Sequence, residues 1–211
     1  MRIIAGIRRG HKFDGPRDSK TRPTSDLVRE SLFNILGDLV DGLLVVDLFA
    51  GAGGIGLEAL SRGARRAIFV ERDRDNVEMI RRNIATLRFE GQAHVMANDT
   101  YRWARASLKH IDEPMVVFID PPYREYENHP ERVTKLLTDL IEHMLPGSAI
   151  ALEAGKTMEL DTLPDLDAWD VRRYGGTRIA IRLVGEPAEA AEDLAEIPSI
   201  HEASDDLDES D

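Results

Sequence analysis

Residues 43–58 read Leu-Leu-Val-Val-Asp-Leu-Phe-Ala-Gly-Ala-Gly-Gly-Ile-Gly-Leu-Glu. The apolar run that opens this stretch is long enough for one strand buried on both faces, as in the middle of a parallel sheet. A loop of small residues follows, and apolar residues at helical spacing resume at Ile55. The stretch therefore predicts a strand, a tight turn and a helix, which is the repeating unit of an α/β fold.

The loop contains Gly51, Gly53 and Gly56 in a G-x-G-x-x-G spacing. In loops of this type the first glycine permits the turn, the second lets a ligand approach the backbone, and the third lets the helix pack on the strand. The same spacing serves NAD and S-adenosylmethionine, and a tight turn without a ligand also fits. The glycines alone therefore do not identify the ligand.

Two acidic residues support a ligand-binding interpretation. Asp47 stands at the carboxyl end of the predicted strand, where open α/β sheets bind ligands. Glu71 ends the next apolar run, about 20 residues after Gly51, where an acid that bonds ribose hydroxyls is expected. The alternative for Glu71 is to cap the helix predicted over residues 73–90.

A second motif follows the buried run of residues 114–119, which leads into Asp120-Pro121-Pro122-Tyr123. Two consecutive prolines cannot continue a sheet ladder, so we expect the strand to stop and Asp120 and Tyr123 to face the ligand edge. With Phe49 at the start of a Phe-x-Gly-x-Gly-type loop, this motif resembles S-adenosylmethionine-dependent methyltransferases that modify planar amino or amide nitrogens. The alternative is a strand terminator without a catalytic role.

Composition limits the class of protein. The chain has 211 residues and contains no cysteine, which excludes disulfides, thiolate metal sites and mechanisms that need a cysteine nucleophile. No apolar stretch is long enough to span a bilayer and no signal peptide follows Met1, so we expect a cytoplasmic protein. The histidines show no metal-ligand spacing, and we expect no metal.

The net charge of −12 is distributed unevenly. Residues 185–211 contain 11 acidic residues and no Lys or Arg, so the rest of the chain is close to neutral. This composition predicts a disordered acidic tail. The first 22 residues are basic and predict a short β-hairpin with its cationic side chains near the turn. These cations could bind RNA phosphates or form a solvated surface; the candidates are Arg8, Arg9, Lys12, Arg17 and Arg22.

Residues 1–6 and 21–34 narrow the resemblance further. Together with residues 120–123 they resemble the ribosomal small-subunit methyltransferase D family, which methylates the N2 amine of a guanine in 16S rRNA, and the match runs from Met1 to about Val184. The resemblance implies S-adenosylmethionine as cofactor and 16S rRNA or the assembling small subunit as partner. It also implies that Asp99 contacts the adenine, although Asp99 could instead cap a helix. The family usually has Phe at position 123; Tyr keeps a flat face but also occurs in adenine-N6 and glutamine-N5 enzymes.

The remaining chain alternates between strand and helix patterns and ends in a hairpin. Further strands are expected at 67–71, 93–97, 148–153, 169–174 and 177–183, and a polar loop over the substrate mouth is expected at 124–129. We therefore predict a Rossmann-like, mostly parallel seven-stranded sheet with one antiparallel strand and helices on both faces. The expected organisation is one methyltransferase domain over 1–184, with a basic hairpin at 1–24 and a core at 25–184, followed by the tail at 185–211. We expect a monomer.

The predicted chemistry depends mainly on position. An exocyclic amine is a poor nucleophile because its lone pair is delocalised into the ring. Asp120 and the Pro121 carbonyl could accept its two hydrogens and aim the lone pair at the methyl donor, within the turn that Pro122 completes. Tyr123 offers a face on which the base stacks. Two alternatives stay open, a DNA adenine-N6 or cytosine-N4 methyltransferase and a non-catalytic RNA-binding or ribosome-assembly protein.

Overall fold

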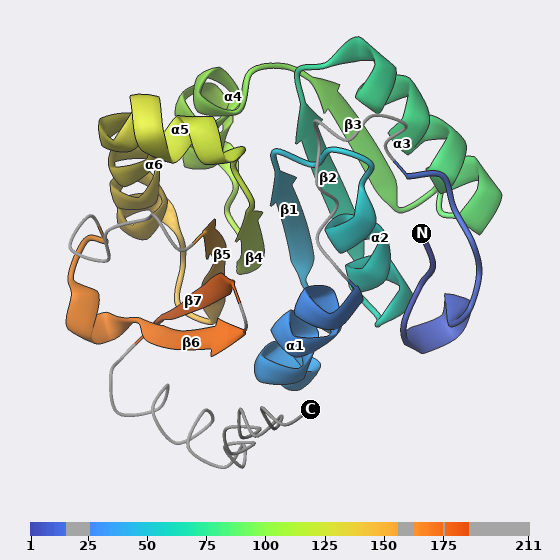
Figure 1. Cartoon of the computed structure of the whole chain (residues 1–211), viewed down its shortest axis with the longest axis horizontal. Helices are drawn as coiled ribbons and strands as arrows, with labels where there is room; N and C mark the ends of the chain where they lie inside the picture. Colours follow the sequence, from blue (N-terminus) through green and yellow to red (C-terminus); the bar gives the residue numbers. More distant parts are fainter. Residues whose placement is uncertain (16–25, 156–162, 175, 186–211) are drawn as a thin grey trace, which may run out of the picture.

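The computed structural model describes residues 1–15, 26–155, 163–174 and 176–185. Within them a seven-stranded sheet has the order β3-β2-β1-β4-β5-β7-β6. Strand β7 runs antiparallel to both of its neighbours and the other pairs are parallel, which confirms the predicted fold class (Figure 1). The strands are β1 Leu44–Leu48, β2 Arg66–Glu71, β3 Ala93–Ala97, β4 Met115–Ile119, β5 Ser148–Gly155, β6 Asp170–Tyr174 and β7 Thr177–Val184.

Helices cover both faces of the sheet because successive strand residues point to opposite sides. Val45 and Phe118 pack with α1, α2 and α3, whereas Val46 and Val117 pack with α4 and α6. The helices are α1 Asp26–Leu36, α2 Gly54–Ser61, α3 Arg74–Leu87, α4 Thr100–Ser107, α5 Tyr123–Asn128 and α6 Pro130–His143. Short 3-10 helices are η1 Gly6–Arg8, η2 Gly37–Val40, η3 Leu108–His110 and η5 Leu166–Ala168.

The prediction of a loop over residues 124–129 is wrong, because most of this stretch forms helix α5. Pro122 has φ −53°, which suits the residue just before a helix, and its carbonyl accepts from the Glu125 N–H at 2.8 Å. The Glu125 side chain is buried, so this short helix is fixed by tertiary contacts that the polar sequence did not suggest.

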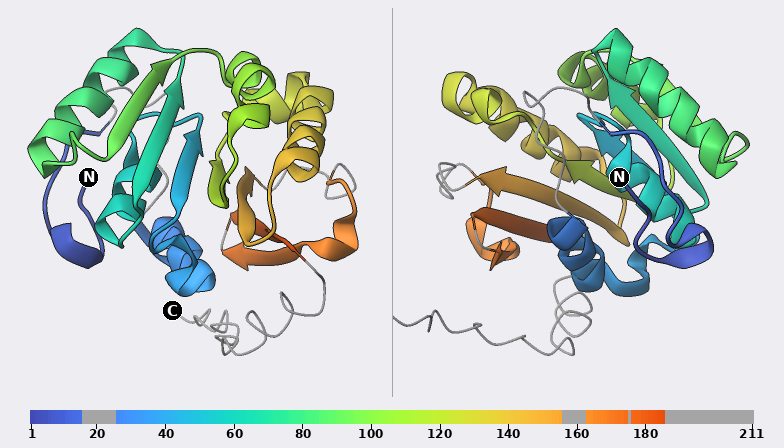
Figure 2. Two further views of the ribbon diagram at one scale, coloured as in Figure 1. Left: turned by 180° about the vertical axis from the view of Figure 1, so that it is seen from behind. Right: turned by 45° about the vertical axis from the view of Figure 1, so that its right-hand side comes forward.

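The expected N-terminal hairpin is only partly formed. We call residues 1–15 the N-terminal segment. One isolated antiparallel bridge joins Arg2 to Lys12, and the turn between them contains η1. Backbone hydrogen bonds pair Ile3 with Gly10 and His11. The next residues, Ile4 and Ala5, leave this ladder and donate their N–H groups to the Glu58 carboxylate of α2 at 2.8 and 2.9 Å. The segment is thus fastened along α2 and α3, as Figure 2 shows.

Gly6 marks the closest approach between the N-terminal segment and α2. It has φ +79°, and a Cβ added there would lie 1.7 Å from the Ser61 carbonyl oxygen. The Ser61 hydroxyl accepts from the Arg8 N–H and donates to the Ala5 carbonyl. Only glycine therefore fits between these two backbones.

Two further observations concern organisation. Among the residues with a described position, no helix is long and apolar enough to cross a membrane. The acidic tail beyond residue 185 and the segments 16–25 and 156–162 lie outside the described residues. The predicted disorder of the tail therefore stays a prediction.

Candidate active site

Three neighbouring strands bring the predicted residues to one edge of the sheet. The register pairs Leu48 at the end of β1 with Val70 of β2 on one side and with Ile119 of β4 on the other. The next residue along each strand is then Phe49, Glu71 or Asp120. The register therefore places these positions together at the carboxyl ends of β1, β2 and β4, the edge at which α/β proteins bind ligands. Figure 1 shows these three strands side by side.

Asp47 is an acidic residue in the middle of this edge. It is buried, and its Oδ2 accepts a hydrogen bond from the Gly56 N–H at 2.9 Å. Burial raises the pKa of Asp47 to about 8; the Gly56 bond opposes this shift, and the charges of Asp120 and Glu71 add to it. A positive charge brought to this edge would favour the ionised form. The carboxyl group is thus poised to respond to a cationic ligand.

Glu71 fastens the glycine loop to the turn after β2. Its Oε2 accepts from the Gly51 N–H at 2.9 Å, and its Oε1 accepts from the Asp73 N–H at 2.8 Å. The cap of α3 is Asp73 itself, whose side chain accepts from Asp75 and Asn76. Each Glu71 oxygen retains a second lone pair, so the carboxylate can also accept from ligand hydroxyls.

The three glycines of the loop have different surroundings. A Cβ added at Gly56 would lie 2.4 Å from the Phe69 ring, so this glycine lets α2 approach β2. At Gly53 the added Cβ would also face the interior, 3.3 Å from Phe69. At Gly51 it would meet nothing nearer than the Phe49 carbonyl oxygen at 4.0 Å. The loop backbone is therefore accessible to a ligand at Gly51. The motif predicted this close approach at Gly53 instead.

Phe49 has an unusual backbone conformation for a residue with a side chain. Its φ is +65°, which costs of order 1–3 kcal/mol for a residue other than glycine. The next residue, Ala50, donates its N–H to the Val70 carbonyl at 3.1 Å. The Phe49 ring meets the Tyr101 ring edge-on, with centroids 5.6 Å apart. Packing thus holds a strained residue at the ligand edge.

Asp99 caps helix α4, which is one of the two roles that the sequence predicted for it. Its side chain accepts from the Arg102 N–H at 3.0 Å and begins α4. Its carboxylate also lies 3.9 Å from Arg72 and 3.9 Å from Arg132. A contact between Asp99 and an adenine stays a prediction.

A charged cluster beside Asp99 was not predicted from the sequence. Glu125 of α5 accepts from the Tyr101 hydroxyl at 3.1 Å and lies 3.8 Å from Arg72 and 3.9 Å from Arg132. The Arg132 guanidinium stacks 4.0 Å from the Tyr101 ring centroid. Burial and the Glu125 charge raise the pKa of Tyr101, so its hydroxyl stays a donor. The cluster holds α5 against α4 and α6. Its residues are far apart in the sequence, so no local sequence pattern could have predicted it.

The Asp120-Pro121-Pro122-Tyr123 motif forms the turn from β4 into α5. Asp120 is half-buried, Pro121 is buried, and Pro122 is exposed. Tyr123 is the first residue of α5. The motif therefore connects the central part of the sheet to the helix that the Glu125 cluster holds.

The sequence family is identified by comparison with known proteins. The family described as Conserved hypothetical protein 95 matches residues 1–183. The chain belongs to this family. It is 38% identical over 184 residues to YlbH of Bacillus subtilis (strain 168), covering 86% of this chain and 97% of that protein. It is 33% identical over 168 residues to Ribosomal RNA small subunit methyltransferase D of Haemophilus influenzae, covering 77% of this chain and 82% of the relative.

A solved structure agrees with this assignment. The structure of yhhF from Escherichia coli matches with a TM-score of 0.71 and 33% identity, covering 88% of this chain and 98% of that chain. The predicted resemblance to the small-subunit methyltransferase D family is thereby confirmed.

The family implies S-adenosylmethionine as cofactor, and the residues of this edge fit it. The backbone is open at Gly51, and Glu71 stands beside it with lone pairs suited to ribose hydroxyls. Asp120 lies close enough to Asp47 for its charge to act on that carboxyl group, and a cationic ligand at this edge would favour the ionised form of Asp47. A nucleoside cofactor with a positive charge is thus a chemical match for the donors and charges present.

The predicted RNA-binding residues differ in their surroundings. Arg8 donates from Nε to the Leu87 carbonyl at 2.8 Å and lies 5.7 Å from the Phe89 ring centroid, so it also anchors the N-terminal segment. Arg9 and Lys12 are exposed. Arg17 and Arg22 lie outside the described residues.

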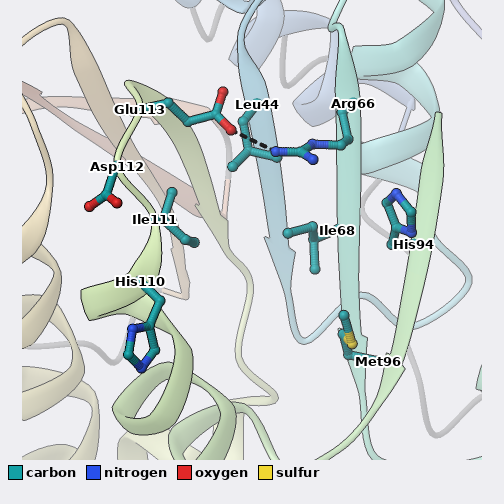
Figure 3. Close-up of a pocket in the computed structure, with 9 residues that line it drawn as sticks. All are labelled: Leu44, Arg66, Ile68, His94, Met96, His110, Ile111, Asp112 and Glu113. Carbon is teal, nitrogen blue, oxygen red and sulfur yellow. Dashed lines mark hydrogen bonds and ion pairs between the residues drawn. The ribbon is translucent and has the colours of Figure 1, made fainter.

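A pocket of about 300 Å³ lies elsewhere, on the sheet face that carries α4 (Figure 3). It is lined by residues of β1, β2 and β3 and by the loop before β4, including Ile68, Met96 and Asp112. None of the predicted site residues lines it, so this pocket is separate from the carboxyl edge. Among the described residues, no group of three or more His, Asp or Glu side chains could hold a metal ion.

Proposed function

We propose that this protein is an enzyme that methylates the exocyclic N2 amine of a guanine in 16S rRNA, with S-adenosylmethionine as the methyl donor. The observation that carries this proposal is the position of residues 120–123 directly after β4, which pairs with β1, the strand that leads into the glycine loop. A substrate amine held by the turn at residues 120–123 would then lie next to a cofactor held by the glycine loop. The similarity to Ribosomal RNA small subunit methyltransferase D of Haemophilus influenzae supports methyl transfer to small-subunit rRNA.

The protein's contribution to the reaction is mainly orientation. The cofactor, when bound, supplies an electrophilic methyl group on its sulfonium sulfur. Asp120 and the Pro121 carbonyl accept the two hydrogens of the amine and direct its lone pair, and the Asp120 carboxylate offsets positive charge that develops on the nitrogen. Glu71 holds the ribose, and Tyr123 stacks on the base. An unpaired guanine is the cheaper target because a paired one must first leave its helix.

The RNA partner is proposed from relatives and from charge. A near-neutral core with exposed cations at Arg9 and Lys12 has a surface suited to phosphates, and Arg17 and Arg22 extend this basic stretch in the sequence. The specific target proposed is the guanine at position 966 of 16S rRNA. The enzyme would act in the cytoplasm as a monomer, on the RNA or on the assembling subunit.

The test is transfer of labelled methyl from S-adenosylmethionine to three acceptors in parallel: unmethylated small ribosomal subunits, naked 16S rRNA and duplex DNA. We expect label on guanine N2 in the RNA-containing samples. Label only on DNA would replace the proposal with a DNA amino-methyltransferase. Cofactor binding without transfer to any acceptor would favour a non-catalytic RNA-binding protein.

A further inference from the structure

Asn83 is a buried amide in the otherwise apolar face of α3. It is 1% exposed, and Ile80, Ile84 and Leu87 on the same face belong to the core. Burying an amide costs free energy unless its hydrogen bonds are satisfied. The position of Asn83 therefore depends on the partners it finds.

Those partners belong to two different parts of the chain. Asn83 Oδ1 accepts from the Asp14 N–H at 2.9 Å, and its Nδ2 donates to the Asp14 carbonyl at 2.9 Å. The same Nδ2 donates to the Ala52 carbonyl at 3.0 Å. Ala52 lies between Gly51 and Gly53, so one side chain holds both the N-terminal segment and the glycine loop.

Packing strengthens this connection. A Cβ added at Gly54, the first residue of α2, would lie 2.9 Å from Met1 Cε and 4.0 Å from Phe13 Cζ. Met1 and Phe13 are joined by two hydrogen bonds. The Met1 amino group donates to the Phe13 carbonyl at 3.0 Å, and the Phe13 N–H donates to the Met1 carbonyl at 3.1 Å. Met1 and Phe13 of the N-terminal segment therefore lie close to Gly54, which follows the loop.

We propose that Asn83 is a positioning residue that couples RNA binding by the N-terminal segment to cofactor binding by the glycine loop. The inference rests on the proposed function. RNA bound by the cations of the segment would restrict residues 1–15, and Asn83 would transmit this restriction to Ala52. The cofactor would then bind a loop that is already ordered, and by linkage the cofactor would tighten RNA binding by the same factor.

The test measures the dissociation constant of S-adenosylhomocysteine by calorimetry, with and without saturating 16S rRNA, on the full-length chain. The wild type should bind it more tightly with RNA present, by about fivefold or more. Asn83→Ser should bring this ratio close to one. Asn34→Ser is the matched control, because Asn34 is exposed on α1, and it should keep the wild-type ratio.

A second variant, Asn83→Leu, nearly keeps the size of the side chain and loses the bonds to both Asp14 and Ala52 without burying a charge. It should also lose the coupling, and it serves if Asn83→Ser folds poorly in a thermal unfolding check. A wild-type ratio in both Asn83 variants would overturn the proposal. The proposal would also be overturned if the variants lost affinity for S-adenosylhomocysteine equally with and without RNA, because an equal loss indicates a structural role for Asn83 and no coupling.

The same samples separate this inference from the proposed function. A wild type that methylates 16S rRNA but shows no coupling refutes the role of Asn83 and leaves the enzyme assignment intact. A wild type whose cofactor affinity responds to RNA without any methyl transfer refutes the enzyme assignment and leaves the coupling.

Discussion

At the scale of single residues, the carboxyl edge combines acids whose environments differ. Asp47 is buried with one hydrogen bond from Gly56, whereas Glu71 accepts from two backbone N–H groups. Burial destabilises the ionised form of Asp47 and raises its pKa to about 8, so the charge of this group depends on pH.

The first prediction concerns Asp47→Asn and stability. The folded chain holds the Asp47 proton up to about pH 8, whereas the unfolded chain releases it near the ordinary pKa of 3.8. Between these values the folded state binds more protons, so this residue lowers the free energy of unfolding as pH rises, by about 1.4 kcal/mol per unit. Asn at this position does not titrate.

The ligand-free Asn variant should therefore gain stability relative to the wild type as pH rises through this window, and the gain should level off above about pH 8. Urea unfolding of both proteins across the window measures the difference. Parallel pH profiles for the two proteins would show that Asp47 is ionised throughout.

The second prediction concerns Asp120→Ala and catalysis. Methyl transfer should fall by roughly 100-fold or more, because the variant loses the acceptor that orients the amine and offsets its charge. Cofactor affinity should change by no more than a few-fold. Asp112→Ala is the control, because Asp112 is an exposed acid at the opposite end of β4. Loss of cofactor binding in Asp120→Ala would show that the role is misassigned.

At the scale of elements, two pieces of the chain were misjudged from sequence and depend on tertiary contacts. The N-terminal segment uses its backbone groups on Glu58 and Ser61 rather than in a full hairpin ladder. Helix α5 forms in a polar stretch because the buried Glu125 side chain accepts from the Tyr101 hydroxyl and lies 3.8 Å from Arg72. Both elements flank the candidate site, so their attachment bears on activity.

The third prediction compares two glycines of the N-terminal segment. Gly6 and Gly10 share a φ of +79°, but an added Cβ meets nothing within 4 Å at Gly10. Gly10→Ala should therefore cost only the backbone strain, roughly 1–2 kcal/mol. Gly6→Ala should cost more and should raise hydrogen exchange of residues 1–15, since the Ser61 backbone cannot move aside. Equal losses of stability in Gly6→Ala and Gly10→Ala would show that the Ser61 backbone can move aside at little cost in free energy.

The fourth prediction compares Glu125→Gln with Glu127→Gln in α5. Gln can still accept from the Tyr101 hydroxyl, but it removes the charge that faces Arg72 and Arg132. We expect α5 to be destabilised by roughly 1 kcal/mol, or about fivefold faster amide exchange. Glu127 is exposed, and its replacement should leave exchange unchanged. Faster exchange in both variants would mean that net charge alone stabilises this helix.

At the scale of the whole molecule, charge is separated along the sequence. The 11 acidic residues of positions 185–211 account for almost all of the net charge of −12. The family match ends at residue 183, just before this stretch. Residues 1–184 are therefore close to neutral, and most of the net charge lies beyond the part that matches the family.

The fifth prediction is that deletion of residues 186–211 leaves methyl transfer intact. The residues assigned to the site lie before position 124, and the last strand ends at Val184. Steady-state rates of the shortened and full-length chains on small subunits measure the effect. A large drop would make the tail part of the site or of the fold.

The sequence by itself determined the seven strands of the sheet, the fold class and the carboxyl edge at which Asp47, Glu71 and Asp120 meet. This was possible because burial on both faces and the glycine and proline turns are local patterns, and strand register then places the strand ends side by side. Only the tertiary structure decided where Asn83, Glu58 and Glu125 find their partners. Those partners are distant in sequence, and a buried polar residue is satisfied by whatever backbone the fold brings to it. The link between the N-terminal segment and the glycine loop therefore appears only once the chain is folded.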